Sequence, residues 1–550
     1  MKVLQIFVYL TKMSSLETES FEIFPFENEL PSAFADRLGI IYASTVTDEH
    51  KKKAGQFFTP LPIAKFIGEF AVSTGEIVKI LDPGCGIGIL SAAMAEDFIF
   101  INPQIKTIEL VAFETDVKLL PLAEMCFNYL RLWLYSKGVE LNYFLCKNDF
   151  ILHNSHILSG REDIHEKYDL IISNPPYFKL PKDDPRSIAA QTVIYGQTNI
   201  YSIFLLIAAK LLKPGGKLIF ITPRSFCSGN YFRMFREQFF SQVDIKNIHL
   251  FESRSSTFKR DKVLQETLII AASAKLNSSP NQLHLPFDQI SKDSIIISSS
   301  SGMSDLDKRT WMFYSAETLI DINSYQKTLH LPSNNEDDKV IDVFRKWDNT
   351  LHKFGWEVST GKIVDFRSQE FILKDPVGNS VPLFWLHNIK YMEYNWPTEN
   401  GVKGKPKRQY FLSNKDSNKL LVPNLNYVLL RRFSAKDDSR KLIAAPYLST
   451  TLNEFDKIGI ENHLNYIYKK QGSLTIEETI GLSALLNSTL FDRYFRTFNG
   501  NINVSATELR DIKLPNIKKI IEIGREVLNE NEITQTSIDG VISRQLKIKL

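Results

Sequence analysis

The sequence predicts an α/β fold with a mainly parallel sheet covered on both faces, followed by a mixed α+β domain. Strand-like and helix-like segments alternate from residue 77 to residue 274. A glycine-rich turn, Gly84-Cys-Gly-Ile-Gly88, joins the first strand to the first helix. Beyond about residue 320 the alternation ends and the chain becomes irregular and rich in aromatic residues. Alternation of this kind is typical of parallel strands joined by helices that pack on both faces of the sheet.

Length and composition describe a globular protein with several domains. The chain has 550 residues, enough for roughly two to four domains. Its 43% hydrophobic and 23% charged residues are ordinary for packed domains. A formal net charge of +3 is too small to indicate nucleic-acid binding by itself. The four cysteines form no Cys-x-x-Cys pair and no Cys/His cluster, so we expect no metal site, no disulfide framework and a cytoplasmic location.

No stretch approaches the ~20 apolar residues of a membrane span, so no membrane association is expected. The apolar start of the chain lacks a small-x-small cleavage pattern, which favours a terminal extension with translation from either Met1 or Met13. Composition divides the chain into four parts: an extension with a helix near 32–43 (residues 1–50), the α/β domain (51–275), a linker region rich in serine (276–320) and the second domain (321–550).

The start of the α/β domain predicts a ligand-binding turn. Thr59-Pro60 is typical of a helix start, with threonine as N-cap and proline at the first helical position. The first strand then leads into a turn that can approach a ligand closely next to a helix amino end, because it contains three glycines: Gly84, Gly86 and Gly88. The second strand ends at Glu114, whose carboxylate is placed to accept hydrogen bonds from ribose hydroxyls.

Two further strands end in polar residues. The third, 142–150, ends at Asp149 and Phe150, which from the residues alone also fits a solvated turn. The fourth, Tyr168 to Ser173, stops abruptly at Asn174-Pro175-Pro176-Tyr177. The Asn174 side-chain oxygen and the Pro175 carbonyl could accept both hydrogens of an exocyclic amine, and the Tyr177 ring could stack on the flat group that carries it. This edge of an α/β sheet is where ligands bind, so the motif indicates a planar amine substrate.

The rest of the chain supplies a loop, three more strands and a basic region. A patternless loop of about twenty residues, 178–198, is expected near the substrate. Strands follow near 217–226 and 247–251, a last strand forms the end of the segment 258–270, and Phe258 lies in the loop before it. In the second domain we expect a turn at 358–362 and one helix over 480–495. Between residues 403 and 441 eleven Lys/Arg stand against three Asp/Glu, interleaved with aromatic rings, which is typical either of a DNA-contacting surface or of a solvated charged face.

The order of these motifs resembles that of S-adenosylmethionine-dependent methyltransferases, in particular type II restriction-modification adenine-N6 DNA methyltransferases of the gamma arrangement. The resemblance rests on Gly-Gln-Phe-Phe-Thr-Pro60, Asp82-Pro-Gly-Cys-Gly, the acidic strand end at Glu114 and Asn174-Pro-Pro-Tyr. It implies a Rossmann-like, seven-stranded class I methyltransferase domain followed by a mixed α+β target-recognition domain. The motifs cover residues 51–275 in specific terms and the remainder only loosely.

The resemblance also implies functions for individual residues. Asn174, Pro175, Pro176 and Tyr177 would be catalytic, and Tyr177 and Phe258 would hold the faces of the target base, although Phe258 alone also fits a partly buried loop aromatic. Cofactor binding would involve Phe57, Thr59, Pro60, Asp82, Gly84, Gly86, Gly88, Glu114, Asp149, Phe150 and Asn174. DNA contacts are assigned to Lys403, Lys405, Lys407, Arg408, Arg431 and Arg432. No metal is expected in the reaction.

The implied activity is methyl transfer from S-adenosyl-L-methionine to adenine N6 in double-stranded DNA by a monomer, with a cognate restriction endonuclease as functional partner. Cytosine-N4 methylation uses the same amine chemistry and stays open, as do RNA or protein-glutamine methylation with the same motif. A DNA-binding module with a vestigial methyltransferase core is the non-enzymatic alternative. A fused nuclease is not expected, because no Pro-Asp…Glu-x-Lys pattern is evident.

Overall fold

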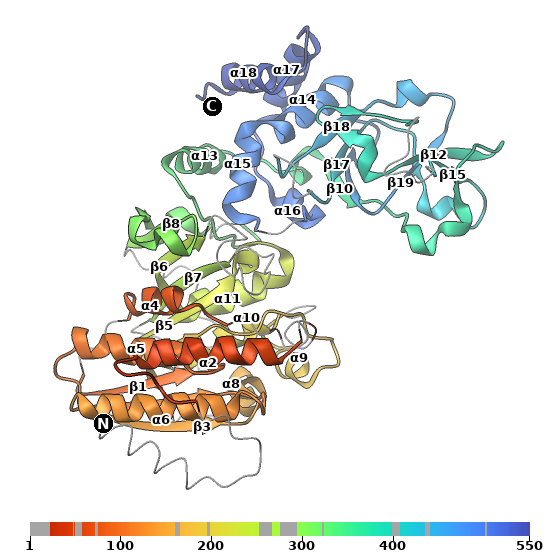
Figure 1. Ribbon diagram of the computed structural model, residues 1–550. Helices are drawn as coiled ribbons and strands as arrows, with labels where there is room; N and C mark the ends of the chain where they lie inside the picture. The colour runs from red at the N-terminus through yellow and green to blue at the C-terminus, as the bar shows by residue number, and fades with distance from the viewer. Residues whose placement is uncertain are drawn as a thin grey trace. The chain divides into compact units, whose positions relative to one another are not determined.

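A computed structural model shows two compact units, which are described separately. The first comprises residues up to Phe226 together with Tyr231–Ile322, and the second comprises Cys227–Asn230 together with Asn323–Leu550 (Figure 1). The structure describes residues 23–47, 49, 55, 58–71, 75–159, 166–194, 199–251, 267–275, 294–321, 324–398, 408–434, 440–500 and 503–549.

The first unit is built on a mixed sheet of nine strands. They are β1 (Ile77–Asp82), β2 (Thr107–Phe113), β3 (Glu140–Cys146), β4 (Tyr168–Ser173), β5 (Leu212–Pro223), β6 (Val243–Phe251), β7 (Thr267–Ala274), β8 (Ser294–Ser300) and β9 (Thr310–Ser315). The strand order is β3-β2-β1-β4-β5-β7-β6-β8-β9. Strands β1 to β5 pair in parallel, whereas β7 is antiparallel to both β5 and β6. The predicted Rossmann-like α/β sheet is confirmed, with two strands added at one edge.

The two added strands correct the predicted linker at 276–320. Strand β8 pairs in parallel with β6, and β9 pairs with β8. The serine run belongs to β8: the ring nitrogens of the fully buried His249 lie 2.8 Å from the Ser298 hydroxyl and 3.1 Å from the Ser300 hydroxyl. The serines therefore satisfy a buried imidazole, which explains why a polar segment forms part of the sheet.

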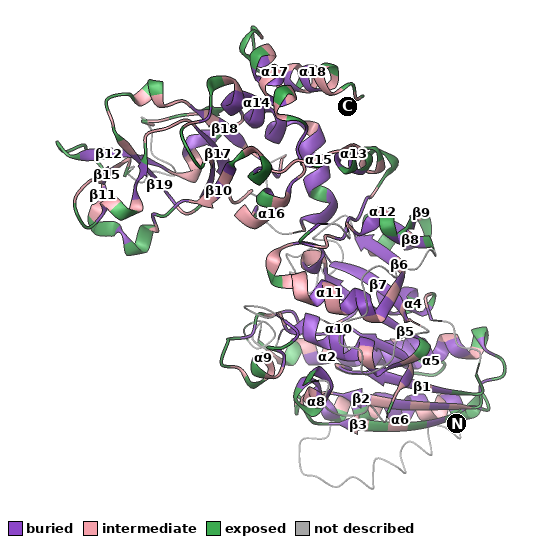
Figure 2. Cartoon of the chain, turned by 180° about the vertical axis from the view of Figure 1, so that it is seen from behind, coloured by how far each residue is buried: buried purple, intermediate pink, exposed green. Residues whose placement is uncertain are grey.

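Helices cover the sheet as expected. They are α2 (Pro31–Thr45), α4 (Leu61–Gly68), α5 (Ile89–Ile101), α6 (Leu120–Ser136), α7 (Phe150–His153), α8 (Ser155–Ser159), α9 (Pro185–Ala189), α10 (Ile200–Leu211), α11 (Arg233–Gln242) and α12 (Ala316–Leu319). Almost every residue of α10 is buried, as the purple ribbon in Figure 2 shows. None of the described helices is long and apolar enough to cross a membrane.

Helix α2 corrects the assignment of residues 1–50 to an extension outside the α/β domain. Its residues Phe34, Leu38 and Tyr42 belong to the core cluster of the first unit. The Ser32 amide and hydroxyl each donate a hydrogen bond of 2.7 Å to the Glu96 carboxylate on α5. Burial of an apolar face and a paired carboxylate fasten α2 to the sheet's helical layer.

The second unit is a mixed α+β domain. Its strands are β10 (Trp356–Thr360), β11 (Ile372–Leu373), β12 (Ser380–Phe384), β13 (Ile389–Lys390), β14 (Glu393–Tyr394), β15 (Tyr410–Leu412), β16 (Val422–Pro423), β17 (Tyr427–Arg431), β18 (Ala444–Tyr447), β19 (Lys457–Ile460) and β20 (Leu464–Lys469). Its helices are α13 (Asn335–Arg345), α14 (Ile476–Asn487), α15 (Thr489–Phe498), α16 (Ala506–Asp511), α17 (Ile517–Leu528) and α18 (Gln535–Leu546). The larger sheets have the orders β10-β20-β17-β18 and β11-β15-β12-β19-β16.

Two local predictions in this unit were wrong. The turn expected at 358–362 is largely strand β10, which pairs with β20 because its alternate residues Trp356 and Val358 are buried in the core. The single helix expected over 480–495 is two helices, because the Ser488 side chain accepts a hydrogen bond from the Phe491 amide and starts α15 anew.

Candidate active site

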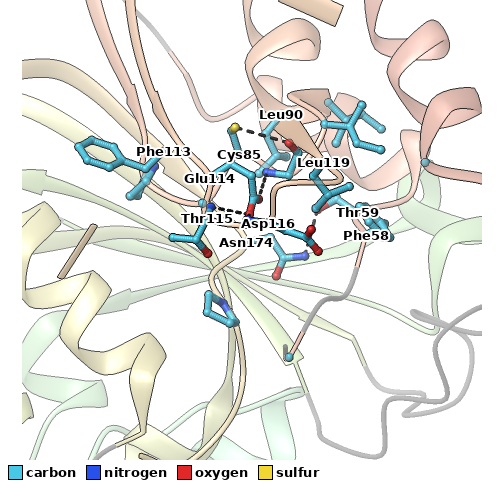
Figure 3. Close-up of a pocket in the computed structure, with 18 of the residues that line it drawn as sticks. Phe58, Thr59, Cys85, Leu90, Phe113, Glu114, Thr115, Asp116, Leu119 and Asn174 are labelled. Atoms are coloured by element: carbon cyan, nitrogen blue, oxygen red, sulfur yellow. Dashed lines mark hydrogen bonds between the residues drawn. The ribbon is translucent and has the colours of Figure 1, made fainter. Parts of the chain in front are cut away.

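A cavity of about 1010 Å³ opens in the first unit beside the carboxyl ends of β1 to β4. Each of these strands contributes to its wall: the glycine turn follows β1, Glu114 follows β2, Asp149 follows β3 and Asn174 follows β4. In Figure 3 the side chains of Glu114 and Asn174 approach the same space, with Thr59 beside Asn174. Eight of the sequence-predicted residues line this cavity: Thr59, Gly84, Gly86, Glu114, Asp149, Phe150, Asn174 and Pro176.

The glycine turn brings backbone to the cavity wall. Gly86 and Gly88 have φ angles of +55° and +88°, a region that side chains rarely adopt. A Cβ on Gly88 would lie 2.5 Å from the Phe127 ring, so α5 could not begin so close to α6. Gly86 lines the cavity, whereas Gly88 does not and instead allows α5 to begin close to Phe127 on α6.

Asp82 lies behind the turn rather than in the cavity wall. It is fully buried, and its Oδ2 accepts a hydrogen bond of 2.7 Å from the Ser91 hydroxyl on α5. Burial raises the pKa of Asp82 to about 7, although hydrogen bonds from Ser91 and the Gly84 amide oppose the shift. The structure therefore gives Asp82 a supporting position under the turn, in place of the cofactor contact expected from the sequence.

Glu114 is held rigidly at the cavity wall. Its Oε1 accepts hydrogen bonds of 2.7 Å from the Thr115 and Asp116 amides, and its Oε2 accepts one of 3.1 Å from the Gly86 amide. Burial raises its pKa to about 7, against the effect of these amides. The carboxylate is thus fixed between the glycine turn and the end of β2, with a pKa that makes its charge sensitive to pH near neutrality.

Asp149 and Phe150 form the far end of the cavity. Asp149 is the N-cap of α7, because its Oδ1 accepts a hydrogen bond of 3.0 Å from the Leu152 amide. Phe150 packs against Phe113 and Phe204, with ring centroids 5.3 and 5.0 Å apart. A carboxylate beside an apolar aromatic wall suits a flat ring that carries an amine.

Asn174 is fixed by two partners. Its Nδ2 donates a hydrogen bond of 3.1 Å to Thr59 Oγ1, which orients the amide, and its Oδ1 accepts from the Tyr177 hydroxyl. The Ile221 carbonyl also lies 3.1 Å from the Tyr177 hydroxyl, so the single hydroxyl proton is shared between two acceptors, and Tyr177 is only 8% exposed. Thr59 was expected to cap α4, but the structure records no side-chain cap there and Pro60 occupies the N-cap position. The Thr59 hydroxyl instead accepts the hydrogen bond from Asn174.

Tyr177 and Pro175 do not line the cavity, whereas Pro176 and Phe178 do. The ring of Tyr177 packs edge to face against Tyr201, with centroids 6.4 Å apart, and burial raises the pKa of its hydroxyl well above the usual value. Gly55 contributes to this packing: with φ +61°, a Cβ there would lie 2.7 Å from the Phe178 ring. Gly55 therefore fits closely against the end of the motif.

Comparison with known proteins places this site in a family. Residues 126–258 match the model of the Eco57I restriction-modification methylase family. The chain is 31% identical over 509 residues to the type II methyltransferase M.PstI of Providencia stuartii, covering 92% of this chain and 95% of the relative. It is 32% identical over 506 residues to M.BsuBI of Bacillus subtilis, covering 90% and 95%. The chain belongs to the type II methyltransferases.

As a type II methyltransferase, the protein is a DNA methyltransferase of the restriction-modification type, and its cofactor is S-adenosyl-L-methionine. A solved methyltransferase subunit of a type I restriction-modification system from Streptococcus thermophilus is more distant, with 17% identity, a TM-score of 0.34 and coverage of 58% and 59%. The cavity fits this cofactor: the glycine backbone can hold its amino-acid part, Glu114 its ribose hydroxyls, and Asp149 with Phe150 its adenine.

Sequence reasoning missed several residues around the methyltransferase cavity. The side of α2 that faces it carries small residues spaced by four, Ala35, Gly39 and Ala43, and this spacing was a usable signal. Phe58 lines the cavity and packs against Tyr42 with centroids 5.5 Å apart, whereas the predicted Phe57 lies outside the described residues. Arg186 also lines the cavity, from a loop that offered no periodicity.

Other predicted sites lie elsewhere or outside the described residues. Phe258, Lys403, Lys405 and Lys407 belong to the residues that the structure does not describe. In the second unit Arg431 Nε donates a hydrogen bond of 2.7 Å to the Ile389 carbonyl, and Arg432 donates one of 3.1 Å to the Asn462 carbonyl. Arg408 is exposed at the start of β15. Within the described residues, no group of three or more His, Cys, Asp or Glu is placed to hold a metal.

Proposed function

We propose that this methyltransferase transfers a methyl group to adenine N6 at a specific site in double-stranded DNA and so protects host DNA from a cognate restriction endonuclease. The observation that carries the proposal is the fixed orientation of Asn174 at the cavity edge. Because Thr59 receives the amide Nδ2, the side-chain oxygen, which also accepts from the Tyr177 hydroxyl, is the atom placed to accept from a substrate amine at its second acceptor position. An oxygen acceptor is what an exocyclic amine requires.

The protein's own contribution is to hold the amine and align it. Asn174 Oδ1 would accept one N6 hydrogen, and the Pro175 carbonyl, which does not line the cavity in this structure, would have to turn towards it to accept the other. These two hydrogen bonds would draw the nitrogen lone pair out of conjugation with the ring. When bound, S-adenosylmethionine supplies a methyl group activated on a sulfonium. As the N–CH3 bond forms, the S–CH3 bond would break to leave the thioether S-adenosylhomocysteine, and the methylated nitrogen would release one proton to solvent. Proximity and alignment in such a site supply about 7–11 kcal/mol towards the barrier.

The adenine must leave the duplex to reach Asn174, because its N6 is stacked and paired inside the helix. Extrusion of a base costs a few kcal/mol. Tyr177 and Phe258 are proposed to hold its faces. Since Tyr177 is only 8% exposed, its ring would have to turn outward to receive the base, or Phe178 would take its place.

The second unit is proposed to recognise the DNA sequence. Its exposed Arg408 and the charged heads of Arg431 and Arg432 would contact phosphates, together with the lysines at 403, 405 and 407. The Arg431 and Arg432 side chains also donate to backbone carbonyls, which fixes their direction. We propose that the enzyme acts as a cytoplasmic monomer on DNA.

The test is to expose unmethylated genomic DNA to the protein and cofactor, then to sequence the DNA for modified bases. We expect N6-methyladenine in one recognition sequence and its loss with Asn174→Ala. N4-methylcytosine in the product would instead support the cytosine alternative, because the same grip on an amine serves that base. Undiminished methylation by Asn174→Ala would overturn the proposed mechanism. Lys106→Gln, which breaks an exposed ion pair with Glu76 next to the amino end of β2, is the matched control.

A further inference from the structure

Arg186 connects the loop after the Asn-Pro-Pro-Tyr motif to the adenine end of the cofactor cavity. It lies on α9 and lines the cavity, with a side chain that is 25% exposed. Its guanidinium forms a two-pronged ion pair with Asp184, with Nε 2.9 Å from Oδ1 and a terminal nitrogen 2.7 Å from Oδ2. Its other terminal nitrogen lies 3.6 Å from Asp149 Oδ2.

The same guanidinium also faces Phe178. Its Cζ lies 5.7 Å from the centre of the Phe178 ring, a distance at which a cation is attracted to an aromatic face. Phe178 follows Tyr177 directly in the chain and lines the cavity. One side chain therefore contacts the carboxylate at the end of β3 and the ring that continues the catalytic motif after β4.

The contacts of α9 favour a coupling between cofactor binding at Asp149 and the position of Arg186. Helix α9 packs against both α7 and α8, and Asp149 caps α7 with one carboxylate oxygen while the other faces Arg186. A ligand that adds a hydrogen bond to Asp149 would fix this carboxylate further. Arg186 contacts both Asp149 and Phe178. Fixing the Asp149 carboxylate would therefore also restrict the motion of Arg186 and of the Phe178 ring.

We propose that Arg186 is a positioning residue through which an occupied cofactor cavity orders Phe178 and the end of the catalytic motif, so that cofactor and DNA bind cooperatively. The inference rests on the proposed function only in that the cofactor's adenine lies at Asp149. Thermodynamic linkage then requires that the cofactor product tighten DNA binding by the same factor by which DNA tightens product binding.

The experiment measures this coupling directly. The dissociation constant of a duplex carrying the recognition sequence is measured with and without S-adenosylhomocysteine, by fluorescence anisotropy at fixed salt. For the unaltered protein we expect S-adenosylhomocysteine to tighten DNA binding about tenfold, within the usual range of coupling between two sites. For Arg186→Gln we expect a ratio below about twofold.

Matched variants separate the coupling from general damage. Arg186→Lys keeps the charge but loses the planar fork, so it should lose the coupling as well. Lys106→Gln should keep it. A partly exposed ion pair contributes little to stability, so Arg186→Gln should fold, which its melting temperature verifies. A wild-type coupling ratio in either Arg186 variant would overturn the inference. If coupling is lost as expected but the product is N4-methylcytosine, the proposed function fails while the inference stands.

Discussion

The hydroxyl of Tyr177 lies against the side-chain oxygen of Asn174, inside the tetrapeptide that defines the candidate active site. Two residues of the motif are thus hydrogen-bonded to each other before any substrate binds. An amide oxygen has two acceptor positions, so this contact and a substrate amine can in principle be accommodated together.

This contact predicts a graded response to substitution at Tyr177. Tyr177→Phe should lower kcat about two- to tenfold, because one neutral hydrogen bond contributes about 0.5–1.5 kcal/mol. Tyr177→Ala should lower kcat much further, since the ring packed on Tyr201 is also lost. Transfer of a labelled methyl group to DNA under saturating cofactor measures both. Equal effects of the two variants would show that the ring itself contributes nothing.

Thr59 offers a second test of the amide's orientation. Thr59→Val has nearly the same shape but removes the hydroxyl that accepts from Asn174 Nδ2. One neutral hydrogen bond contributes about 0.5–1.5 kcal/mol, so kcat should fall about two- to tenfold. Thr59→Ser keeps the hydroxyl and should stay near the wild-type rate. A Val variant as active as the Ser variant would mean that Thr59 does not orient Asn174.

Glu114 predicts a pH dependence of cofactor binding. Its pKa is raised by burial to about 7, and ribose hydroxyls donate best to the ionised form. The affinity for S-adenosylhomocysteine should therefore rise as the pH increases from 6 to 7.5, approaching about tenfold per pH unit below the pKa. Calorimetric titration measures it, and Glu114→Gln should flatten the profile. An unchanged slope in that variant would assign the titration to another group, such as the neighbouring Asp82.

The raised pKa of Glu114 also affects the free energy of unfolding, but in the opposite direction to its effect on cofactor affinity. In the unfolded chain Glu114 titrates at about 4.3, so between about pH 4.3 and 7 the folded state binds more protons than the unfolded state. The contribution of Glu114 to the free energy of unfolding therefore decreases as the pH rises through this window. Glu114→Gln should reduce this decrease, which thermal unfolding of the cofactor-free protein at several pH values would measure.

His249 predicts loss of stability in acid. Burial lowers its pKa to about 3, whereas the unfolded chain binds a proton near 6.5. The stability that neutral His249 contributes is fully present above pH 6.5 and declines as the pH falls towards 3. Its slope approaches about 1.4 kcal/mol per pH unit for one proton. His249→Leu should be less stable at pH 7 but show a shallower loss between pH 6.5 and 5 in thermal unfolding. A slope as steep as that of the wild type would contradict this.

Strands β1, β2 and β4 could be predicted from sequence because each is a mainly apolar segment with mostly buried residues, and their polar ends then indicated the cavity. Strands β8 and β9 could not, because Ser298 and Ser300 look like linker residues until the buried imidazole that they satisfy is known. A local sequence pattern predicts which residues are buried. It does not predict a hydrogen bond between residues 49 positions apart, such as His249 and Ser298.

The residues of the candidate site were likewise predicted from sequence only in part. Glu114, Asp149 and Asn174 follow directly from their positions at strand ends. The location of Asp82 behind the turn does not, since a carboxylate before a glycine turn can point either way. Arg186 was missed because its importance comes from contacts with Asp149 and Phe178, which no spacing in the loop reveals.

Helix α2 closes one side of the cavity although it precedes every strand that the structure describes. It is fastened by Ser32 to Glu96, and by the Tyr42 hydroxyl, which donates a hydrogen bond of 2.8 Å to Asp116 just beyond Glu114. Residues of α2 thus belong to the ligand's surroundings as fully as the glycine turn does. A bound cofactor would contact both α2 and the glycine turn, so we expect it to stabilise the attachment of α2 against local unfolding.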